Sequence, residues 1–137
     1  MSVVLDSSVT LAWVYSHETS QAVTQVLRQV SSNGAWVPSL WRLEVANILE
    51  MGVRRRRHDA AFRDATLADL AMLPISIDPE TDTNAWGRTV RLAERHRLTV
   101  YDAAYLELAQ RRRLPLASLD LELRAAAEAE KLPLHGM

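Results

Sequence analysis

Glu44 occupies an unusual position in the segment LWRLEVANIL, residues 40–49. At helical spacing its neighbours are Leu40, Trp41, Asn47 and Ile48, so no cation lies three or four residues away on the same helix. A carboxylate on an apolar stripe without a partner costs several kcal/mol, or else it takes up a proton. Glu44 must therefore face a partner that its own helix does not provide.

Three aspartates occupy comparable positions. Asp6 follows the apolar run VVL and Asp120 follows PLASL, so both are expected at the carboxyl ends of strands, where open α/β sheets bind ligands. Asp102 opens the helix expected in TVYDAAYLELA, and the residues that follow it provide no cation. Capping is an alternative for each aspartate, because Asp is a preferred N-cap residue and Thr99 and Asp102 have the spacing of a capping box.

These four acids together suggest a metal site. Carboxylates that converge on one rim of a sheet repel one another, and some take up protons unless a divalent cation neutralises them. Their hard oxygen ligands suit Mg²⁺ or Mn²⁺. One or two such ions can activate water and stabilise the leaving oxygen in phosphodiester hydrolysis. In this interpretation Glu44 faces a metal.

The elements that position these acids can be predicted from the pattern of apolar residues. Strands are expected over residues 2–5, 35–38, 73–78 and 114–120, with a fifth edge strand over 132–136. Helices are expected over residues 9–15, 20–30, 39–56, 59–72, 80–96, 97–113 and 121–130. Strands that alternate with helices indicate βαβ units and a parallel sheet covered on both faces. We therefore expect an α/β fold: one three-layer α/β/α domain over residues 1–137, with a central parallel sheet of four or five strands.

The composition excludes several classes of protein. A chain of 137 residues with 48% hydrophobic and 24% charged residues is expected to form one globular domain and is not typical of disorder. The absence of cysteine excludes disulfides, thiolate metal sites and a cysteine nucleophile. The net charge of −1 predicts no strong overall attraction to nucleic acid or membranes. The N-terminus lacks the pattern of a signal peptide and no apolar run approaches the length of a membrane span, so a cytoplasmic location is expected.

The cations are almost all arginine, and many of them fall in two clusters. Both clusters come at the ends of expected helices, where cations complement the helix dipole in a solvated turn. A second interpretation, compatible with the first, is contact with the phosphate backbone of a nucleic acid. The possible backbone contacts are Arg54, Arg55, Arg56, Arg57, Arg111, Arg112 and Arg113.

In order and spacing, the Asp of VVLDSSV, the Glu of LEVANIL, the Asp of TVYDAAYLELA and the Asp of ASLD resemble the acidic signature of PIN-domain ribonucleases. The small form in which a strand comes first is most similar to VapC toxins of bacterial type II toxin–antitoxin systems. The resemblance runs from Val3 to about Leu134. One departure is Leu123, where the family often carries Phe, and Glu122 is an additional acid without an assigned role.

The resemblance implies the roles of six residues. By this match the catalytic and metal-binding residues are Asp6, Glu44, Asp102 and Asp120, with Mg²⁺ or Mn²⁺ as the cofactor. Ser8 and Ser118 match the small hydroxyl positions that support the acids through hydrogen bonds.

The activity implied is that of a metal-dependent endoribonuclease toxin, in which activated water attacks an RNA phosphodiester. The partners implied are the RNA substrate, a cognate VapB-type antitoxin that inserts a segment into the acidic pocket, and a second copy of the chain in a homodimer. One alternative is a PIN-like RNA- or protein-binding module without turnover. A less favoured alternative is a haloacid dehalogenase-like phosphatase, which needs a second carboxylate where Ser8 stands and a late lysine, whereas Lys131 is the sole lysine.

Histidine-based ribonuclease chemistry is disfavoured by the sequence. The four histidines are scattered, no two of them have metal-ligand spacing, and they are interpreted as surface residues. They are His17, His58, His96 and His135.

Overall fold

A parallel β-sheet runs through the molecule in a computed structural model that describes residues 1–15 and 18–137. Five strands form the sheet in the described part of the chain, in the order β3-β2-β1-β4-β5, and every neighbouring pair is parallel. They are β1 (Val3–Leu5), β2 (Ala35–Val37), β3 (Ile75–Ile77), β4 (Leu116–Ala117) and β5 (Leu134–His135). The expected three-layer α/β/α fold is confirmed, and its sheet has the larger of the two expected strand numbers.

The helices follow the expected order, with ends that differ by a few residues. They are α1 (Ser7–Val14), α2 (Gln21–Asn33), α3 (Trp41–Arg54), α4 (Ala60–Ala71), α5 (Thr81–Asn84), α6 (Val90–His96), α7 (Val100–Arg112) and α8 (Leu121–Ala129). The single helix expected over 80–96 has three parts, because a π-helical segment, Ala85–Thr89, separates α5 from α6. Among the described residues, no helix combines the length and apolar character needed to cross a bilayer.

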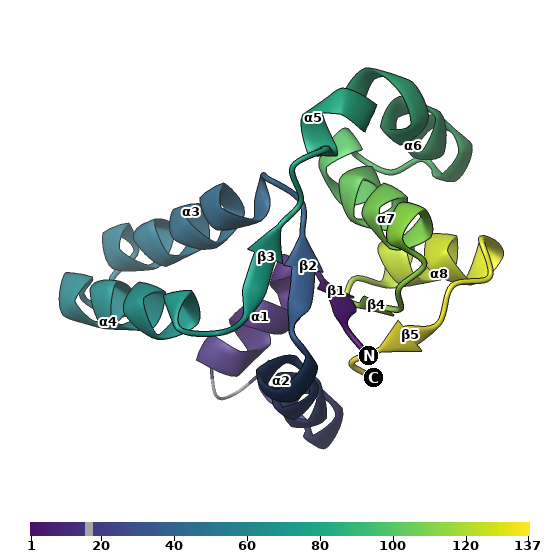
Figure 1. The fold of residues 1–137 in the computed structure, drawn as a ribbon. Helices are drawn as coiled ribbons and strands as arrows, with labels where there is room; N and C mark the ends of the chain where they lie inside the picture. The colour runs from purple at the N-terminus through teal and green to yellow at the C-terminus, as the bar shows by residue number, and fades with distance from the viewer. Residues whose placement is uncertain (16–17) are drawn as a thin grey trace.

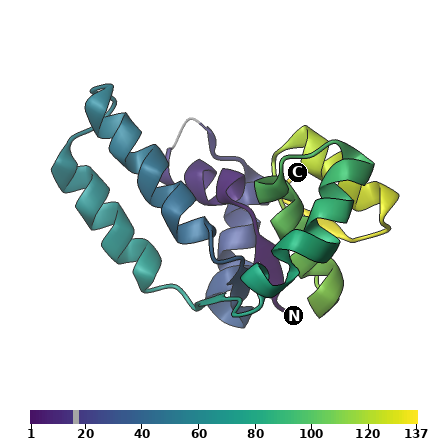
Figure 2. The same ribbon diagram turned by 90° about the horizontal axis from the view of Figure 1, so that it is seen from above.

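Two groups of helices lie on opposite sides of the strands, and α1 and α2 lie between these groups (Figure 1). Helices α3 and α4 form a pair that projects to one side, and α5 to α8 lie on the other side (Figures 1 and 2). This arrangement places the first turns of α3 and α7 toward the middle of the molecule.

The core is formed by the central strand and by α7. All three residues of β1 are fully buried, and the seven consecutive residues 103–109 of α7 are buried as well. Burial on all sides explains why α7 shows little amphipathic pattern. Strand β1 pairs in parallel with both β2 and β4, so the residues that follow β1 and β4 meet at the same edge of the sheet.

Candidate active site: a carboxylate rim

Asp6 is fixed at this edge by two serine hydroxyls. Its Oδ2 accepts hydrogen bonds from Ser8 Oγ (2.6 Å) and Ser118 Oγ (2.8 Å), and Asp6 is almost completely buried. Asp6 stands at the N-cap position of α1, but its side chain does not cap the helix. Burial is the main cause that raises the pKa of Asp6; the two hydroxyls lower it in part and the carboxylate of Asp120 raises it further. Asp6 is therefore held for a purpose other than capping.

The same two serines fix the segment that carries Asp120. The backbone N–H of Leu119 donates to Ser8 Oγ (2.9 Å), and the N–H of Asp120 donates to Ser118 Oγ (3.0 Å). Asp120 also caps α8, because its Oδ1 accepts from the N–H of Leu123 (3.0 Å). For Asp120 capping therefore holds, and it coexists with a place beside Asp6.

Glu44 faces the hydroxyl of a tyrosine on another helix. Tyr105 in α7 is fully buried, and its hydroxyl donates to Glu44 Oε1 in the first turn of α3. Burial raises the pKa of Glu44; the Tyr105 hydroxyl lowers it, and the carboxylates of Asp6 and Asp102 raise it. Glu44 thus shares its surroundings with two further acids, as its sequence position suggests.

Asp102 lies in the first turn of α7, three residues before Tyr105. Its backbone N–H donates to Thr99 Oγ1 (3.1 Å), so Thr99 is the residue that caps this helix. Burial raises the pKa of Asp102, and the carboxylates of Asp120, Asp6 and Glu122 raise it further. Glu122 is thereby placed within electrostatic reach of the acids.

The structure therefore brings the four predicted acids to one rim, where they repel one another. The donor type and the accumulated negative charge fit a hard divalent cation. In the described parts of the chain, however, no three Asp, Glu or His side chains stand close enough together to hold an ion as they are placed. The four carboxylates are thus of the type that binds such a cation, but as they are placed they do not form a set of ligands.

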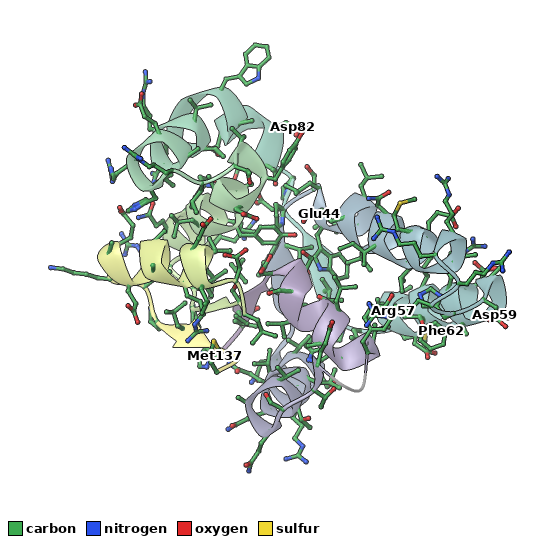
Figure 3. The ribbon with its side chains drawn as sticks, turned by 180° about the vertical axis from the view of Figure 1, so that it is seen from behind. Glu44, Arg57, Asp59, Phe62, Asp82 and Met137 are labelled. Atoms are coloured by element: carbon green, nitrogen blue, oxygen red, sulfur yellow. The ribbon has the colours of Figure 1, made fainter. Side chains whose placement is uncertain are left out.

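The first arginine cluster, residues 54–57, lies at the opposite end of α3 from Glu44. Arg54 pairs with Glu50 on the same helix (3.0 Å), and it lies about 15 Å along the axis from Glu44. Arg57 stacks on the ring of Tyr15 at 3.6 Å. Figure 3 shows Glu44 near the middle of the molecule and Asp59, just after this cluster, far from it.

The second cluster contains two cations that are not simply solvated. Arg111 pairs with Asp78 (2.6 Å) and with Glu107 (2.7 Å), both of which are almost completely buried. Arg112 also pairs with Asp78 (3.1 Å), and its guanidinium lies 3.5 Å above the ring of Trp36. The expectation of a solvated helix end is wrong for these two residues, because the buried acids after β3 and within α7 need counter-charges.

The histidines do not form a site among the described residues. His58 lies 2.9 Å from the hydroxyl of Tyr15, and His96 lies 2.7 Å from a carboxylate oxygen of Glu130. The side chain of His96 is 11% exposed, so the interpretation of His96 as a surface residue is wrong. His17 lies outside the described residues.

Two residues that support the rim, Tyr105 and Arg124, were not identified from the sequence. Tyr105 could have been noticed because it follows Asp102 at helical spacing and so shares its face. Arg124 donates to the backbone carbonyls of Ser118 (2.7 Å) and His135 (2.9 Å), which ties the Ser118 segment to β5. No sequence pattern pointed to the role of Arg124.

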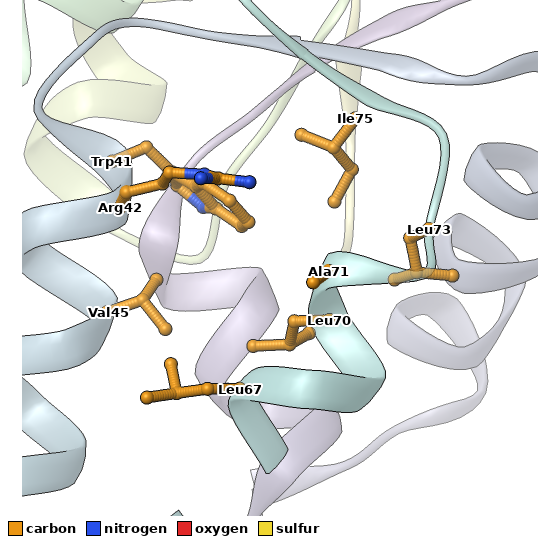
Figure 4. A pocket seen from close by; sticks show the side chains of 8 residues that line it. All are labelled: Trp41, Arg42, Val45, Leu67, Leu70, Ala71, Leu73 and Ile75. Atoms are coloured by element: carbon orange, nitrogen blue, oxygen red, sulfur yellow. The ribbon is translucent and has the colours of Figure 1, made fainter. Parts of the chain in front are cut away.

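The molecule also has a pocket with a mainly apolar lining. It has a volume of about 210 Å³ and lies between α3, α4 and β3 (Figure 4). Its lining residues are Trp41, Arg42, Val45, Leu67, Leu70, Ala71, Leu73 and Ile75. None of the four acids lines this pocket, so it is not part of the carboxylate rim.

A family model described as the PIN domain matches residues 3–129 of the chain. No curated protein matches the chain in sequence.

Three solved structures share the fold. PAE2754 from Pyrobaculum aerophilum has a TM-score of 0.71 at 23% identity, covering 98% of this chain and 83% of that chain. VapBC2 from Rickettsia felis, bound to a DNA fragment from their promoter, has a TM-score of 0.67 at 13% identity, covering 98% and 97%. A toxin–antitoxin complex from Klebsiella pneumoniae has a TM-score of 0.56 at 18% identity, covering 86% of each chain. At these identities the likeness concerns the fold alone.

Proposed function

The chain belongs to the PIN domain family, and on that premise we propose that it is a metal-dependent endoribonuclease that acts as a toxin. PIN domains are generally nucleases. The proposal covers residues 1–137 as one nuclease domain that acts on RNA in the cytoplasm. Its catalytic and metal-binding residues are Asp6, Glu44, Asp102 and Asp120, and its cofactor is Mg²⁺ or Mn²⁺.

One observation carries the proposal. Two hydroxyls hold the carboxylate of Asp6 and also hold the segment that carries Asp120. Asp102 and Glu44 lie close enough to other acids of the rim that those acids raise their pKa values. Burying several acids around one rim is unfavourable without a cation, and such an arrangement is typical of a site that serves a reaction.

Each residue has a proposed task. A bound Mg²⁺ or Mn²⁺ would supply activation of water and stabilisation of the leaving oxygen in phosphodiester hydrolysis. Ser8 and Ser118 orient the Asp6 carboxylate through their hydrogen bonds. Tyr105 orients the Glu44 carboxylate and favours its ionised form. Both supports are made by buried or half-buried groups, so the acids are positioned before substrate arrives.

A cognate VapB-type antitoxin is the proposed inhibitor, and a homodimer is the proposed assembly. The proposal is supported by the shared fold with structures described as a toxin–antitoxin complex and as VapBC2. The apolar pocket between α3 and α4 supports a protein partner, because it gives apolar side chains a place to dock.

The test is RNA cleavage by purified protein freed of antitoxin. Wild type is incubated with total RNA across a Mn²⁺ titration, beside Asp102→Asn and a control variant, Asp69→Asn, whose exposed acid lies on α4. We expect discrete fragments from wild type and the control, no fragments with chelator, and none from Asp102→Asn. Binding of Mn²⁺ without any cleavage by wild type would contradict the nuclease and indicate a binding module without turnover.

A further inference from the structure

A second pocket lies beside the acid rim, between the end of α6 and the start of α8. Its volume is about 290 Å³. It is lined by His96, Arg97, Glu122, Ala125 and Ala126. Arg97 precedes the cap of the helix that carries Asp102, and Glu122 lies two residues after Asp120 in the first turn of α8. The pocket is thus bounded by the two segments that carry acids of the rim, and the effect of Glu122 on Asp102 agrees with that closeness.

Arg97 is the cation of this pocket that is free to bind a ligand. Its neighbours Arg95 and His96 both contact the carboxylate of Glu130, at 3.0 and 2.7 Å. The Arg97 side chain is exposed, and among the described residues it has no hydrogen-bond or ion-pair partner. A guanidinium without a partner, next to an acidic rim, is available to a negatively charged ligand.

The backbone conformation of Arg97 does not distinguish it from three other cations of the chain. Arg97 has a left-handed conformation (φ 54°), and the other non-glycine residues with positive φ in the described chain are Arg56, Arg113 and Lys131. Each of these cations follows or ends a helix, where the helix dipole favours positive charge. Arg97 differs from the others in its place between the segments of Asp102 and Asp120.

We propose that Arg97 binds a backbone phosphate of the RNA strand that flanks the scissile phosphate. The inference rests on the proposed function. RNA is a polyanion, and the acid rim repels it everywhere except where the metal and cations compensate. The planar guanidinium pairs with phosphate oxygens through two parallel hydrogen bonds, which suits a positioning contact without sequence preference. Arg97 thereby offsets the repulsion that Glu122 and Asp102 exert on the RNA strand beside the rim.

The experiment compares Arg97→Gln with two matched controls. Arg91→Gln removes an exposed arginine from the same helical stretch, and Lys131→Gln removes a cation with the same left-handed backbone. With an oligonucleotide that wild type cleaves, we expect Arg97→Gln to raise KM by about 10- to 100-fold with kcat unchanged. The slope of log K for RNA binding against log salt concentration should decrease in magnitude by about one. Both controls should keep the wild-type KM and slope, and Arg97→Lys should recover part of the loss.

A second readout separates this inference from the nuclease proposal. Binding of a fluorescent RNA oligonucleotide is measured by anisotropy in EDTA, so that cleavage does not enter the result. Weaker binding by Arg97→Gln than by both controls supports the phosphate contact even if wild type cleaves nothing, in which case the nuclease proposal alone fails. Equal binding and equal KM for Arg97→Gln and the controls would overturn the contact while cleavage by wild type still stands.

Discussion

Replacing Arg111 with methionine is expected to destabilise the fold by about 3–5 kcal/mol, because a buried ion pair loses one partner. The side chains of Asp78 and Glu107 are 0% and 1% exposed, and both depend on this guanidinium. After the substitution Asp78 keeps Arg112, whereas Glu107 keeps no cation partner among the described residues. The expected loss is a large share of the roughly 5–15 kcal/mol that stabilises an ordinary domain.

Urea unfolding followed by circular dichroism measures this loss. Arg113→Gln, at an exposed neighbouring position, should stay within about 0.5 kcal/mol of wild type. The double variant Arg111→Met/Glu107→Gln should recover part of the loss, because it leaves no unpaired charge on Glu107. If Arg111→Met unfolds at the urea concentration of wild type, the buried pair does not stabilise the fold and the reasoning fails.

The pH dependence of this network has a definite sign. Burial raises the pKa of Asp78, but hydrogen bonds from Arg111 and Arg112 outweigh it and hold the pKa below the ordinary value of 3.8. The carboxylate therefore stabilises the fold fully above that ordinary value, and the contribution is lost as pH falls through the lowered pKa. Arg111→Met should consequently unfold at a higher pH than wild type in an acid titration.

Two further predictions concern the acid rim. Tyr105→Phe removes the hydroxyl that lowers the pKa of Glu44, so the acid limb of the pH–rate profile for RNA cleavage should move to higher pH. Tyr101→Phe, at an exposed position, is the control and should leave the profile unchanged. An acid limb that does not move in Tyr105→Phe would contradict the role of Tyr105. The pKa values of Asp6, Glu44 and Asp102 are raised, so the stability that these groups contribute is present below the ordinary carboxyl values of 3.8 and 4.5 and is lost as pH rises through the raised values. Protons compete with Mn²⁺ for these carboxylates. Mn²⁺ at one hundred times its Kd near neutral pH should therefore stabilise the protein by about 2.7 kcal/mol at that pH, and the same Mn²⁺ concentration should stabilise it much less in acid, as measured by thermal unfolding. Equal stabilisation at both pH values would contradict binding at these acids.

The order of strands and helices was predictable from sequence, while several of their ends were not. Strand and helix patterns differ in period, so alternating apolar runs and amphipathic stretches identify βαβ units. The fourth strand was expected over 114–120, yet β4 ends at Ala117. The reason is local: the hydroxyl of Ser118 accepts from the N–H of Asp120, which turns the chain out of the sheet toward α8. Such a side-chain contact has no periodic signature.

The meeting of acids at one edge was partly predictable, because parallel strands end at the same side of a sheet. This argument covers Asp6 and Asp120, whereas the partner of Glu44 depends on how α3 and α7 pack. Glu44 and Tyr105 are 61 residues apart, and no spacing rule relates two helices at that separation. Arg111 shows the same limit, since its environment is set by Asp78 from beyond β3.

The chemistry of the cleaved RNA ends tests the central claim most directly. An oligonucleotide is cleaved by wild type in Mn²⁺ and its fragments are analysed by mass spectrometry, with Asp102→Asn as the inactive comparison. If the carboxylate rim directs water onto the phosphodiester, the fragments made by wild type carry no 2′,3′-cyclic phosphate. No fragments should form when chelator is added or when Asp102→Asn replaces wild type. Cyclic phosphate ends, or fragments that persist with chelator and in Asp102→Asn, would show that Asp6, Glu44, Asp102 and Asp120 do not form the hydrolytic site.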